Sequence, residues 1–318
     1  MDPAANIFAS ARFLRRWCDH LRGDCDLRLR FVMDAAQVVG VVPEVRERAA
    51  DGRRTVHFAG GEHVTDYRGP VSRAEHRAAV VDAWLASLAE EADFDELIAG
   101  GLAEDAGWAQ LLCDRATRAG LEVVDAGVDG VCPRVDLTGG WDAYLQRISG
   151  KQRHEIRRKA RKLAREGGVV KLVSVDTEDL EGAMATFIAM NRSLDGDKGR
   201  FFVDERMQAF FLALAQEFGS DGVLRMHRLD VDGSPAALTV SLVGGADLGE
   251  WRLYNSAFDR HLASLAPGMV LVGELIRIAA EEGFTVFDLL RGDEPYKYRF
   301  GATDRRVCTV TARPRAAA

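Results

Sequence analysis

Cysteine is scarce in this chain, and its placement excludes two classes of small stabilised fold. The five cysteines are scattered, odd in number and never spaced as Cys-x-x-Cys: Cys18, Cys25, Cys113, Cys132 and Cys308. A disulfide framework or a zinc knuckle needs paired cysteines, so this usage is typical of a reducing compartment. The seven histidines are equally dispersed, and we expect no bound metal.

Long apolar runs and blocks of like charge are missing as well. Arginines and an aspartate interrupt residues 1–30 before any apolar run develops, and no later stretch is long enough to span a membrane. We therefore expect no signal peptide and no membrane span, and we predict a cytoplasmic protein. The net charge of −7, with no charged tail, argues against a protein that binds nucleic acid over much of its surface.

Size and periodicity indicate two halves of similar design. The 318 residues are 47% hydrophobic, enough for two medium-sized cores. In the first half we predict strands at 27–33, 38–45, 55–59, 63–67 and 94–98, and a helix over 72–91 with Ser72 as its N-cap. In the second half we predict strands at 223–229, 236–243, 250–258 and 285–290, and helices over 205–218 and 267–282.

The two halves can be aligned in sequence, and they differ at one position that bears on function. Residues 96–100 of the first half align with residues 288–292 of the second, and Ala99 stands where the second half has Arg291. The identity is thin, but the first half has no charged cluster at this position. We interpret the first half as structural or substrate-shaping and place the chemistry in the second.

The segment 287–297 is the strongest candidate for that chemistry. A short apolar strand pattern ends in an acid pair, two cations and a phenol: Arg291, Asp293, Glu294, Tyr296 and Lys297. A site at the mouth of a sheet often requires such a mixture. The alternative is that these charges pair with one another to pin a loop, with Asp288 acting only as a cap or a structural partner.

A second candidate site lies at residues 264–269, between a strand and an apolar helix. Pro267 suits a first helical turn, and Gly268 keeps that turn free of side-chain bulk. The unpaired amides there form an anion site suited to pyrophosphate, so Ser264, Pro267, Gly268 and Met269 are predicted to bind the phosphates of a cofactor. The alternative is an ordinary helix N-terminus with nothing bound.

The third feature is a basic helix over 151–166. Between Lys151 and Arg165 eight cations face the single acid Glu155, and several of them are like charges four residues apart, which weakens an isolated helix. Arg157 is our candidate for contact with an anionic partner. The alternative is a solvated face whose charges are answered by acids elsewhere in the chain.

These segments resemble the GNAT acyltransferase superfamily in its CelD-like and FemAB-like two-domain branch. The resemblance is carried by 254–259, Pro267-Gly268, 287–297 and the opening of the second half at 141–145. It implies an α/β (α+β) fold of two tandem GNAT-like domains, each a mixed, largely antiparallel sheet flanked by helices. We place a probably degenerate N-terminal domain at 1–137, and at 138–318 an acyltransferase domain opened by the basic helix.

The resemblance implies transfer of an acyl group from acyl-CoA, usually acetyl-CoA, to an amine by direct attack. Asp293 and Glu294 are then candidates for the base, and Tyr296 for the donor of a proton to the departing thiolate. The candidates for substrate binding are Asp288, Arg291, Lys297, Arg157 and, in the first half, Asp66 and Tyr67. The expected acceptor is a small-molecule or sugar-linked amine, with polysaccharide or cell-envelope metabolism as the implied setting.

Two alternatives stay open at this point. One is a FemAB-like transferase that uses aminoacyl-tRNA, which the basic helix permits although no long inserted helical arm is visible. The other is a non-catalytic anion-binding module on the same fold. It is favoured by the absence of the Arg/Gln-x-x-Gly-x-Gly loop, of which only Gly268 is present, whereas the charged cluster argues against it. The sequence does not indicate the acceptor, the acyl chain or the oligomeric state.

Overall fold

The computed structural model describes residues 6–193, 197–244 and 249–315, and their contacts form two compact units. Unit 1 comprises residues up to Val131 together with the segment from Arg305 onward, and unit 2 comprises Cys132–Asp304. The sequence analysis places residues 305–318 in the second half instead. The structure differs because the last strand leaves unit 2 and pairs with a strand of unit 1.

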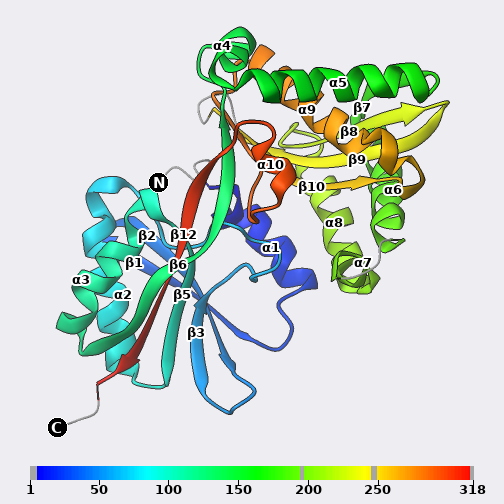
Figure 1. Cartoon of the computed structure of the whole chain (residues 1–318). Coiled ribbons are helices and arrows are strands. Elements are labelled where there is room, and N and C mark those ends of the chain that lie inside the picture. Colours follow the sequence, from blue (N-terminus) through cyan, green and yellow to red (C-terminus); the bar gives the residue numbers. More distant parts are fainter. Residues whose placement is uncertain (1–5, 194–196, 245–248, 316–318) are drawn as a thin grey trace. The chain divides into compact units, whose positions relative to one another are not determined.

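Unit 1 is built on a sheet of mixed direction (Figure 1). Its strands are β1 (Asp26–Asp34), β2 (Gln37–Arg48), β3 (Arg54–Phe58), β4 (Val71–Ser72), β5 (Glu96–Ala103), the first part of β6 (Leu121–Asp136) and β12 (Thr303–Pro314). They lie in the order β1-β2-β3-β5-β12-β6, with β4 beside β2. All pairs with a printed register are antiparallel except β3–β5.

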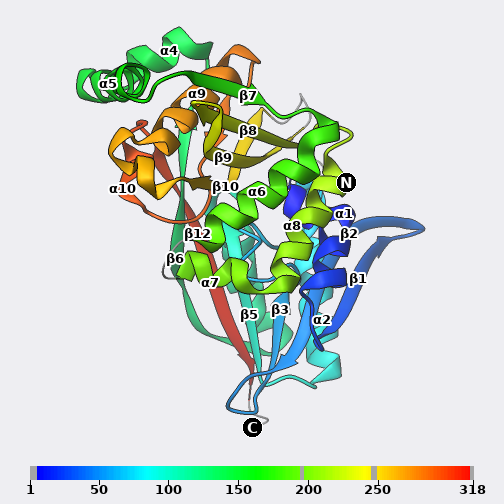
Figure 2. The same ribbon diagram turned by 90° about the vertical axis from the view of Figure 1, so that its right-hand side faces the viewer.

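Helices cover both faces of this sheet. The helices are α1 (Ala11–His20), α2 (Arg77–Glu91) and α3 (Trp108–Ala116), with short 3-10 turns at Ile7–Ala9, Ala74–His76, Glu104–Ala106 and Thr117–Ala119. The core around Trp84 and Leu112 joins α2 and α3 to β2, β3 and β5, whereas α1 lies on the other side (Figures 1 and 2). Helix α1 buries Phe13 and Trp17 there.

Unit 2 contains a second sheet, in the order β6-β11-β10-β9-β8-β7. Beyond the end of β6, its strands are β7 (Val170–Ser174), β8 (Leu224–Val231), β9 (Ser234–Val243), β10 (Glu250–Phe258) and β11 (Val286–Asp288). Its helices are α4 (Gly140–Arg147), α5 (Gly150–Glu166), α6 (Leu180–Arg192), α7 (Asp197–Val203), α8 (Glu205–Phe218), α9 (Pro267–Glu281) and α10 (Pro295–Tyr298), with 3-10 turns η5 (Thr177–Asp179) and η7 (Arg260–Leu265). Among the strand pairs whose register is described in this unit, only β10–β11 is parallel.

Two layers of helices enclose the sheet of unit 2 (Figure 2). Helix α9 packs on β8, β9 and β10, and α4 and α5 pack on α9. Its Leu271 and Leu275 share a core with Trp251 of β10. On the opposite face α6 and α8 contact the strands, and Phe211 of α8 stacks on Tyr254 at 5.5 Å between ring centroids. The predicted fold of two mixed, largely antiparallel units flanked by helices is confirmed.

Some local predictions are wrong. Residues 63–67 form no strand, because this segment turns after Gly60 and Gly61, both at positive φ. Ser72 does not cap the helix: it lies in β4, its hydroxyl donates to the carbonyl of Val39 at 3.0 Å, and α2 begins only at Arg77. Helix α1 and strand β12 have no counterpart among the predicted elements.

Candidate active site

Strands β10 and β11 separate after a short pairing and form a fork. Their register has three pairs, of which Arg252 with Asp288 is the last. Strand β10 then continues to Phe258 beside β9, with an irregularity between Leu253 and Asn255. Among the described residues no strand pairs with this distal part of β10 on its β11 side. An edge with unpaired backbone groups therefore lies at the start of the segment that follows β11.

Asp288 ends β11 and is fully buried. Its carboxylate accepts a hydrogen bond from the amide of Leu290 at 2.8 Å and lies 3.7 Å from Nε of Arg134. Leu290 has φ of +55°, a left-handed conformation that a leucine adopts at some cost in energy. The contacts of Asp288 thus shape the turn that opens the fork, and its predicted contact with substrate stays a prediction.

Lys297 holds the loop after the fork in place. It is only 3% exposed, and its amine donates to the carbonyl oxygens of Leu290, Arg291 and Gly292 at 2.9, 2.8 and 3.1 Å. The amine also lies 2.9 Å from a carboxylate oxygen of Glu294. These contacts match the alternative in which charges pin the loop. Arg291, the other predicted binding cation, is half-buried.

Asp293 and Tyr296 are the two catalytic candidates in this segment whose side chains do not hold the loop in place. Asp293 is exposed, and in the described part of the chain no hydrogen bond or ion pair engages its carboxylate. Tyr296 is half-buried against the core of unit 2. Burial, and to a lesser extent Glu294, raises the pKa of its phenol well above the usual range. The phenol of Tyr296 therefore carries its proton at neutral pH.

The predicted anion site lies at the N-terminus of α9. Ala266, at φ +53°, precedes Pro267, and no side chain caps the helix. The amides of Gly268 and Met269 occupy the second and third helical positions, where an α-helix provides no partner of its own. A Cβ at Gly268 would meet Phe258 at 3.5 Å, an ordinary contact, so packing alone does not require glycine here.

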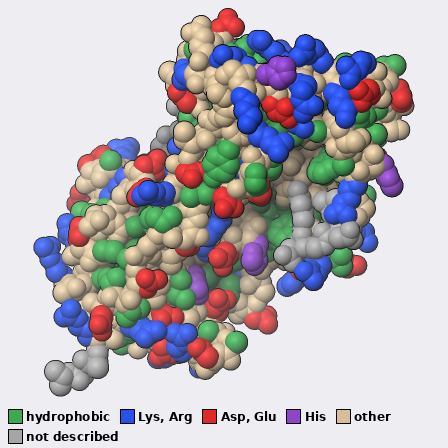
Figure 3. Space-filling view, in the orientation of Figure 1, with side chains coloured by type: hydrophobic (Ala, Val, Ile, Leu, Met, Phe, Trp, Pro, Cys, Tyr) green, Lys and Arg blue, Asp and Glu red, His purple; other side chains and the backbone are tan. Residues whose placement is uncertain are grey.

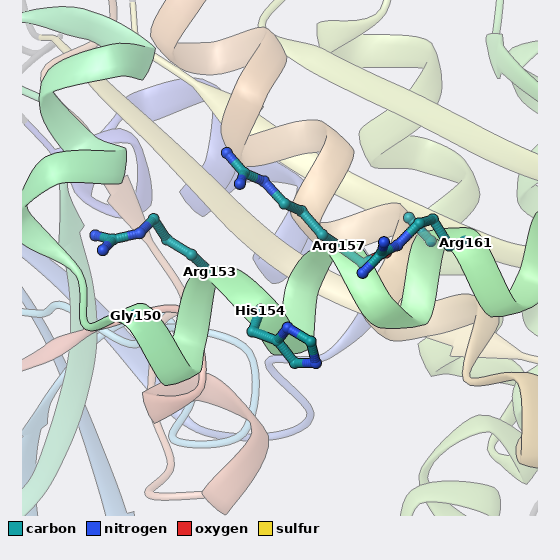
Figure 4. A pocket seen from close by; sticks show the side chains of 6 residues that line it. Gly150, Arg153, His154, Arg157 and Arg161 are labelled. Carbon is teal, nitrogen blue, oxygen red and sulfur yellow. The ribbon is translucent and has the colours of Figure 1, made fainter.

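Helix α5 connects the two candidate sites. At one end the side-chain amide of Gln152 (Nε2) donates to the backbone carbonyl of Tyr298 in α10 at 2.9 Å. At the other end Lys162 donates to the carbonyl of Ser264, in the turn before α9, at 3.0 Å. Arg157, between them, is exposed. It borders a hollow of about 610 Å³ (Figure 4), and Lys and Arg side chains gather over this helix (Figure 3).

Asp66 and Tyr67 belong to unit 1, unlike the other predicted site residues. Tyr67 is 5% exposed, and the guanidinium of Arg305 lies 4.6 Å from the centre of its ring. Asp66 is half-buried. The contacts of Tyr67 are those of a packed side chain inside unit 1, and its predicted role at a substrate site stays a prediction.

The sequence analysis missed a buried charged group at the base of the fork. Arg252 is 2% exposed and forms an ion pair with Glu250, which also pairs with Arg134. Two nitrogens of Arg252, Nε and Nη1, have no hydrogen-bond partner among the described residues. The available signal was a cation between Trp251 and Leu253 in the predicted strand at 250–258.

Neither a metal site nor a membrane-spanning helix is present in the described ranges. Within them, no group of three or more His, Cys, Asp and Glu side chains is placed to hold a metal ion. None of the helices described is long and apolar enough to cross a bilayer.

Comparison with known proteins finds a family similarity in the second half of the chain. Residues 150–298 match the acetyltransferase (GNAT) domain family, which confirms the resemblance noted in the sequence. A comparison with curated proteins gives no match.

Three solved structures share the fold along nearly the whole chain. FemX aligns with a TM-score of 0.62 at 11% identity, over 95% of this chain and 90% of its own. A conserved protein of unknown function from Bacteroides thetaiotaomicron gives 0.64 at 12% identity, over 98% and 90%. A DUF2156 domain from Agrobacterium fabrum gives 0.58 at 14% identity, over 94% and 92%. At these identities the similarity concerns the fold alone.

Proposed function

We propose that this protein is an acyl-transferring enzyme, because residues 150–298 match the acetyltransferase (GNAT) domain family. We propose that it moves an acyl group, acetyl in the first instance, from acyl-CoA to an amine by direct attack. The observation that carries this proposal is the fork between β10 and β11, beyond which β10 continues to Phe258, a neighbour of Gly268 at the uncapped N-terminus of α9.

The residues at the fork fit acyl-CoA as a co-substrate. The amides of Gly268 and Met269, with the positive end of the α9 dipole, suit a pyrophosphate. The edge of β10 beyond Leu253 presents backbone groups that can hydrogen-bond to an extended, amide-containing arm, as an added strand would. Together they hold the two ends of a long co-substrate and bring its thioester to the base of the fork.

The transfer then requires one proton to leave the amine and one to reach the sulfur. We assign the first to the carboxylate of Asp293, directly or through a water, because this exposed acid is not engaged in the loop. As the nitrogen–carbon bond forms and the carbon–sulfur bond breaks, the phenol of Tyr296 protonates the departing thiolate. Amides on the edge of β10 stabilise the oxyanion. Glu294 serves chiefly as the partner of Lys297.

The acceptor is proposed at the level of its chemical class. The family resemblance favours a small-molecule or sugar-linked amine of polysaccharide or cell-envelope metabolism. Asp288, the last paired residue of β11, and Arg291, three residues further along the chain, are candidates for contact with it.

The test is release of free CoA from acetyl-CoA in the presence of a panel of amines, including amino sugars and nucleotide-linked amino sugars. We expect thiol release that depends on at least one amine, with the acylated product seen by mass spectrometry. A parallel reaction supplies aminoacyl-tRNA as the donor. Transfer from aminoacyl-tRNA with none from acyl-CoA would overturn the proposal.

A further inference from the structure

Strand β1 forms one edge of the sheet of unit 1. Among the described residues it pairs only with β2, along its whole length from Asp26 to Asp34. The irregularity in this pair falls on β2, where Val39 is the extra residue, so β1 itself has no bulge. Figure 2 shows the β1–β2 hairpin running out from unit 1 as an arm. An edge strand of nine residues with neither proline nor lysine lacks the usual features that prevent pairing with another chain.

One face of β1 is covered by its own unit. Side chains of a strand alternate between its two faces, and Arg28 and Arg30 both point to the side of α2. They donate to the carboxylate of Glu91 in that helix at 3.0 and 2.8 Å. Val32, on the same face, packs against the core of unit 1. The interactions of β1 with the rest of its unit are therefore made on this face.

The other face carries the apolar stripe, which consists of Leu29, Phe31 and Met33. Their side chains are 49%, 59% and 51% exposed. Isolated apolar side chains on a protein surface require no explanation, but a contiguous apolar row on an edge strand indicates a site of interaction. The stripe lies beside the unpaired backbone groups of the edge, so one partner strand would cover both.

We propose that β1 pairs with β1 of a second copy of this chain, antiparallel and about a twofold axis at Phe31. The proposal goes beyond the function proposed above and does not depend on it. In this register Phe31 lies opposite Phe31 of the second copy, and Leu29 lies opposite Met33. Each residue of the stripe then has an apolar neighbour on the same face, and such cross-strand pairs stabilise a sheet.

The charges on the opposite face are complementary in the same register. Arg28 lies opposite Asp34 of the second copy, and this pair occurs twice about the axis. Asp34 is exposed, and no described residue forms a hydrogen bond or an ion pair with its carboxylate. Arg28 pairs with Asp26 and Glu91 in its own unit, yet 34% of its side chain remains exposed. The second copy thus supplies a cation to an acid that has none within its own chain.

Neighbouring registers fit less well. A twofold axis at Arg30 would set Arg30 against itself and Asp26 against Asp34, and like charges directly opposite each other destabilise a sheet. An axis at Val32 would leave Leu29 outside the paired part of β1. One strand therefore contains both halves of each favourable pair, as an interface between two identical copies requires. This self-complementarity favours a second copy over an unrelated partner.

The size of the contact sets its expected strength. A standard interface involves about 20–30 residues from each partner, whereas β1 supplies nine. We therefore expect a weak dimer in equilibrium with the monomer, and its dissociation can be followed by sedimentation velocity of the full chain over a series of concentrations.

Two variants of β1 test the dimer. Phe31→Lys places a charge at the axis, and we expect at least about a tenfold higher Kd for dimerisation, near 1.4 kcal/mol. Asp34→Arg sets like charges opposite each other in two pairs, and we expect a Kd about threefold higher or more. Both side chains are exposed, so each variant should stay folded, with a Tm close to that of wild type.

The matched control is Val128→Lys. Val128 is 51% exposed and lies on β6, at the opposite end of the strand order of unit 1. The variant introduces the same charge on an exposed apolar residue of another strand of that sheet, and we expect the Kd of wild type.

Oxidative cross-linking tests the register. Because position 31 faces itself across the axis, Phe31→Cys should form an interchain disulfide on mild oxidation. Met33→Cys should form none above the wild-type background, since position 33 faces position 29 of the second copy. Equal cross-linking in these two variants would overturn the register and the charge pairing that rests on it.

Three results would overturn the dimer itself. They are a wild-type chain that stays monomeric at every concentration, a dimer whose Kd is unchanged in Phe31→Lys, and a dimer weakened equally in Val128→Lys. None of these results bears on acyl transfer, which is measured separately by release of CoA.

Discussion

The parallel strand pairs β3–β5 and β10–β11 are built alike, yet only the second leaves an edge open. Each pair has a register of three residue pairs and is joined by a crossover helix, α2 or α9. In unit 1, β5 continues to Ala103, and the amide of Arg68 bonds to the carbonyl of Gly101 beside it at 2.8 Å. In unit 2, β11 stops at Asp288 and a left-handed turn carries the chain away.

The difference shows how one design serves two purposes. In unit 1 the segment around Arg68 fills the space beside β5 beyond its pairing with β3. A Cβ on Gly101 would come within 2.7 Å of the guanidinium of Arg68, and the ring of Tyr67 packs against Arg305. In unit 2 the corresponding gap is bordered by an uncapped helix end and by the loop that Lys297 holds. This contrast supports the interpretation that the chemistry belongs to unit 2.

The largest effect should come from the two candidate catalytic residues. We expect Asp293→Asn and Tyr296→Phe each to lower kcat by about 10²- to 10⁴-fold, because each removes a proton-transfer group. The matched change in unit 1 is Tyr67→Phe, which should leave kcat near that of wild type. The measurement is steady-state release of CoA, with circular dichroism to show that the variants are folded. Wild-type kcat in both unit 2 variants would refute these roles.

The next effect concerns the N-termini of the two crossover helices. Gly268→Asp places a carboxylate at the start of α9, where it stabilises the helix by about 0.5 kcal/mol but repels a pyrophosphate. We expect the Kd for acetyl-CoA to rise at least about tenfold while Tm stays level or increases. Ala79→Asp adds the same charge to the first turn of α2 and should raise Tm without changing the Kd. Equal Kd values for the two variants would contradict the assignment.

The buried His227 of unit 2 and the half-buried His57 of unit 1 give the two units different responses to acid. Burial, with a contribution from Arg225, lowers the pKa of His227 to about 4, whereas the unfolded value is near 6.5. Between these values the unfolded chain binds the extra proton, so unit 2 should lose about 3 kcal/mol of stability as pH falls from 6.5 to 4. Denaturant unfolding of His227→Phe should show a flatter pH dependence. The control is His57→Gln in unit 1, where Glu47 partly opposes the effect of burial on the pKa. A wild-type pH dependence in His227→Phe would disprove the linkage.

A further prediction tests how the loop after the fork is held. Lys297→Met should destabilise unit 2 by about 2 kcal/mol, because three loop carbonyls lose their donor. It should also reduce kcat/KM by displacing Asp293. Lys171→Met, an exposed lysine on β7, is the control and should change neither quantity. A loss of stability with full activity would show that the loop does not position the base.

The sequence predicts elements well where the signal is local. The bounds of β10 at 250–258 and of α8 at 205–218 agree with the structure, because alternation, helical spacing and turn residues all lie within the element. Strand β12 was not predicted, since its partners β5 and β6 are distant in sequence and no short-range pattern reports such pairing.

The candidate site was predictable in composition but not in geometry. The segment 287–297 stands out by its charges, yet nothing local indicates that Lys297 is buried or that β11 ends at Asp288 rather than at residue 290. Both depend on hydrogen bonds formed after the sheet is assembled.

The stoichiometry of acetyl-CoA binding tests the central claim most directly, namely that the open fork of unit 2 holds the co-substrate and the filled gap of unit 1 does not. Isothermal titration calorimetry should give one site per chain for wild type and for Ala79→Asp. The same titration should give strongly weakened binding for Gly268→Asp. Two sites per chain, no binding, or one site of unchanged affinity in Gly268→Asp would contradict the claim.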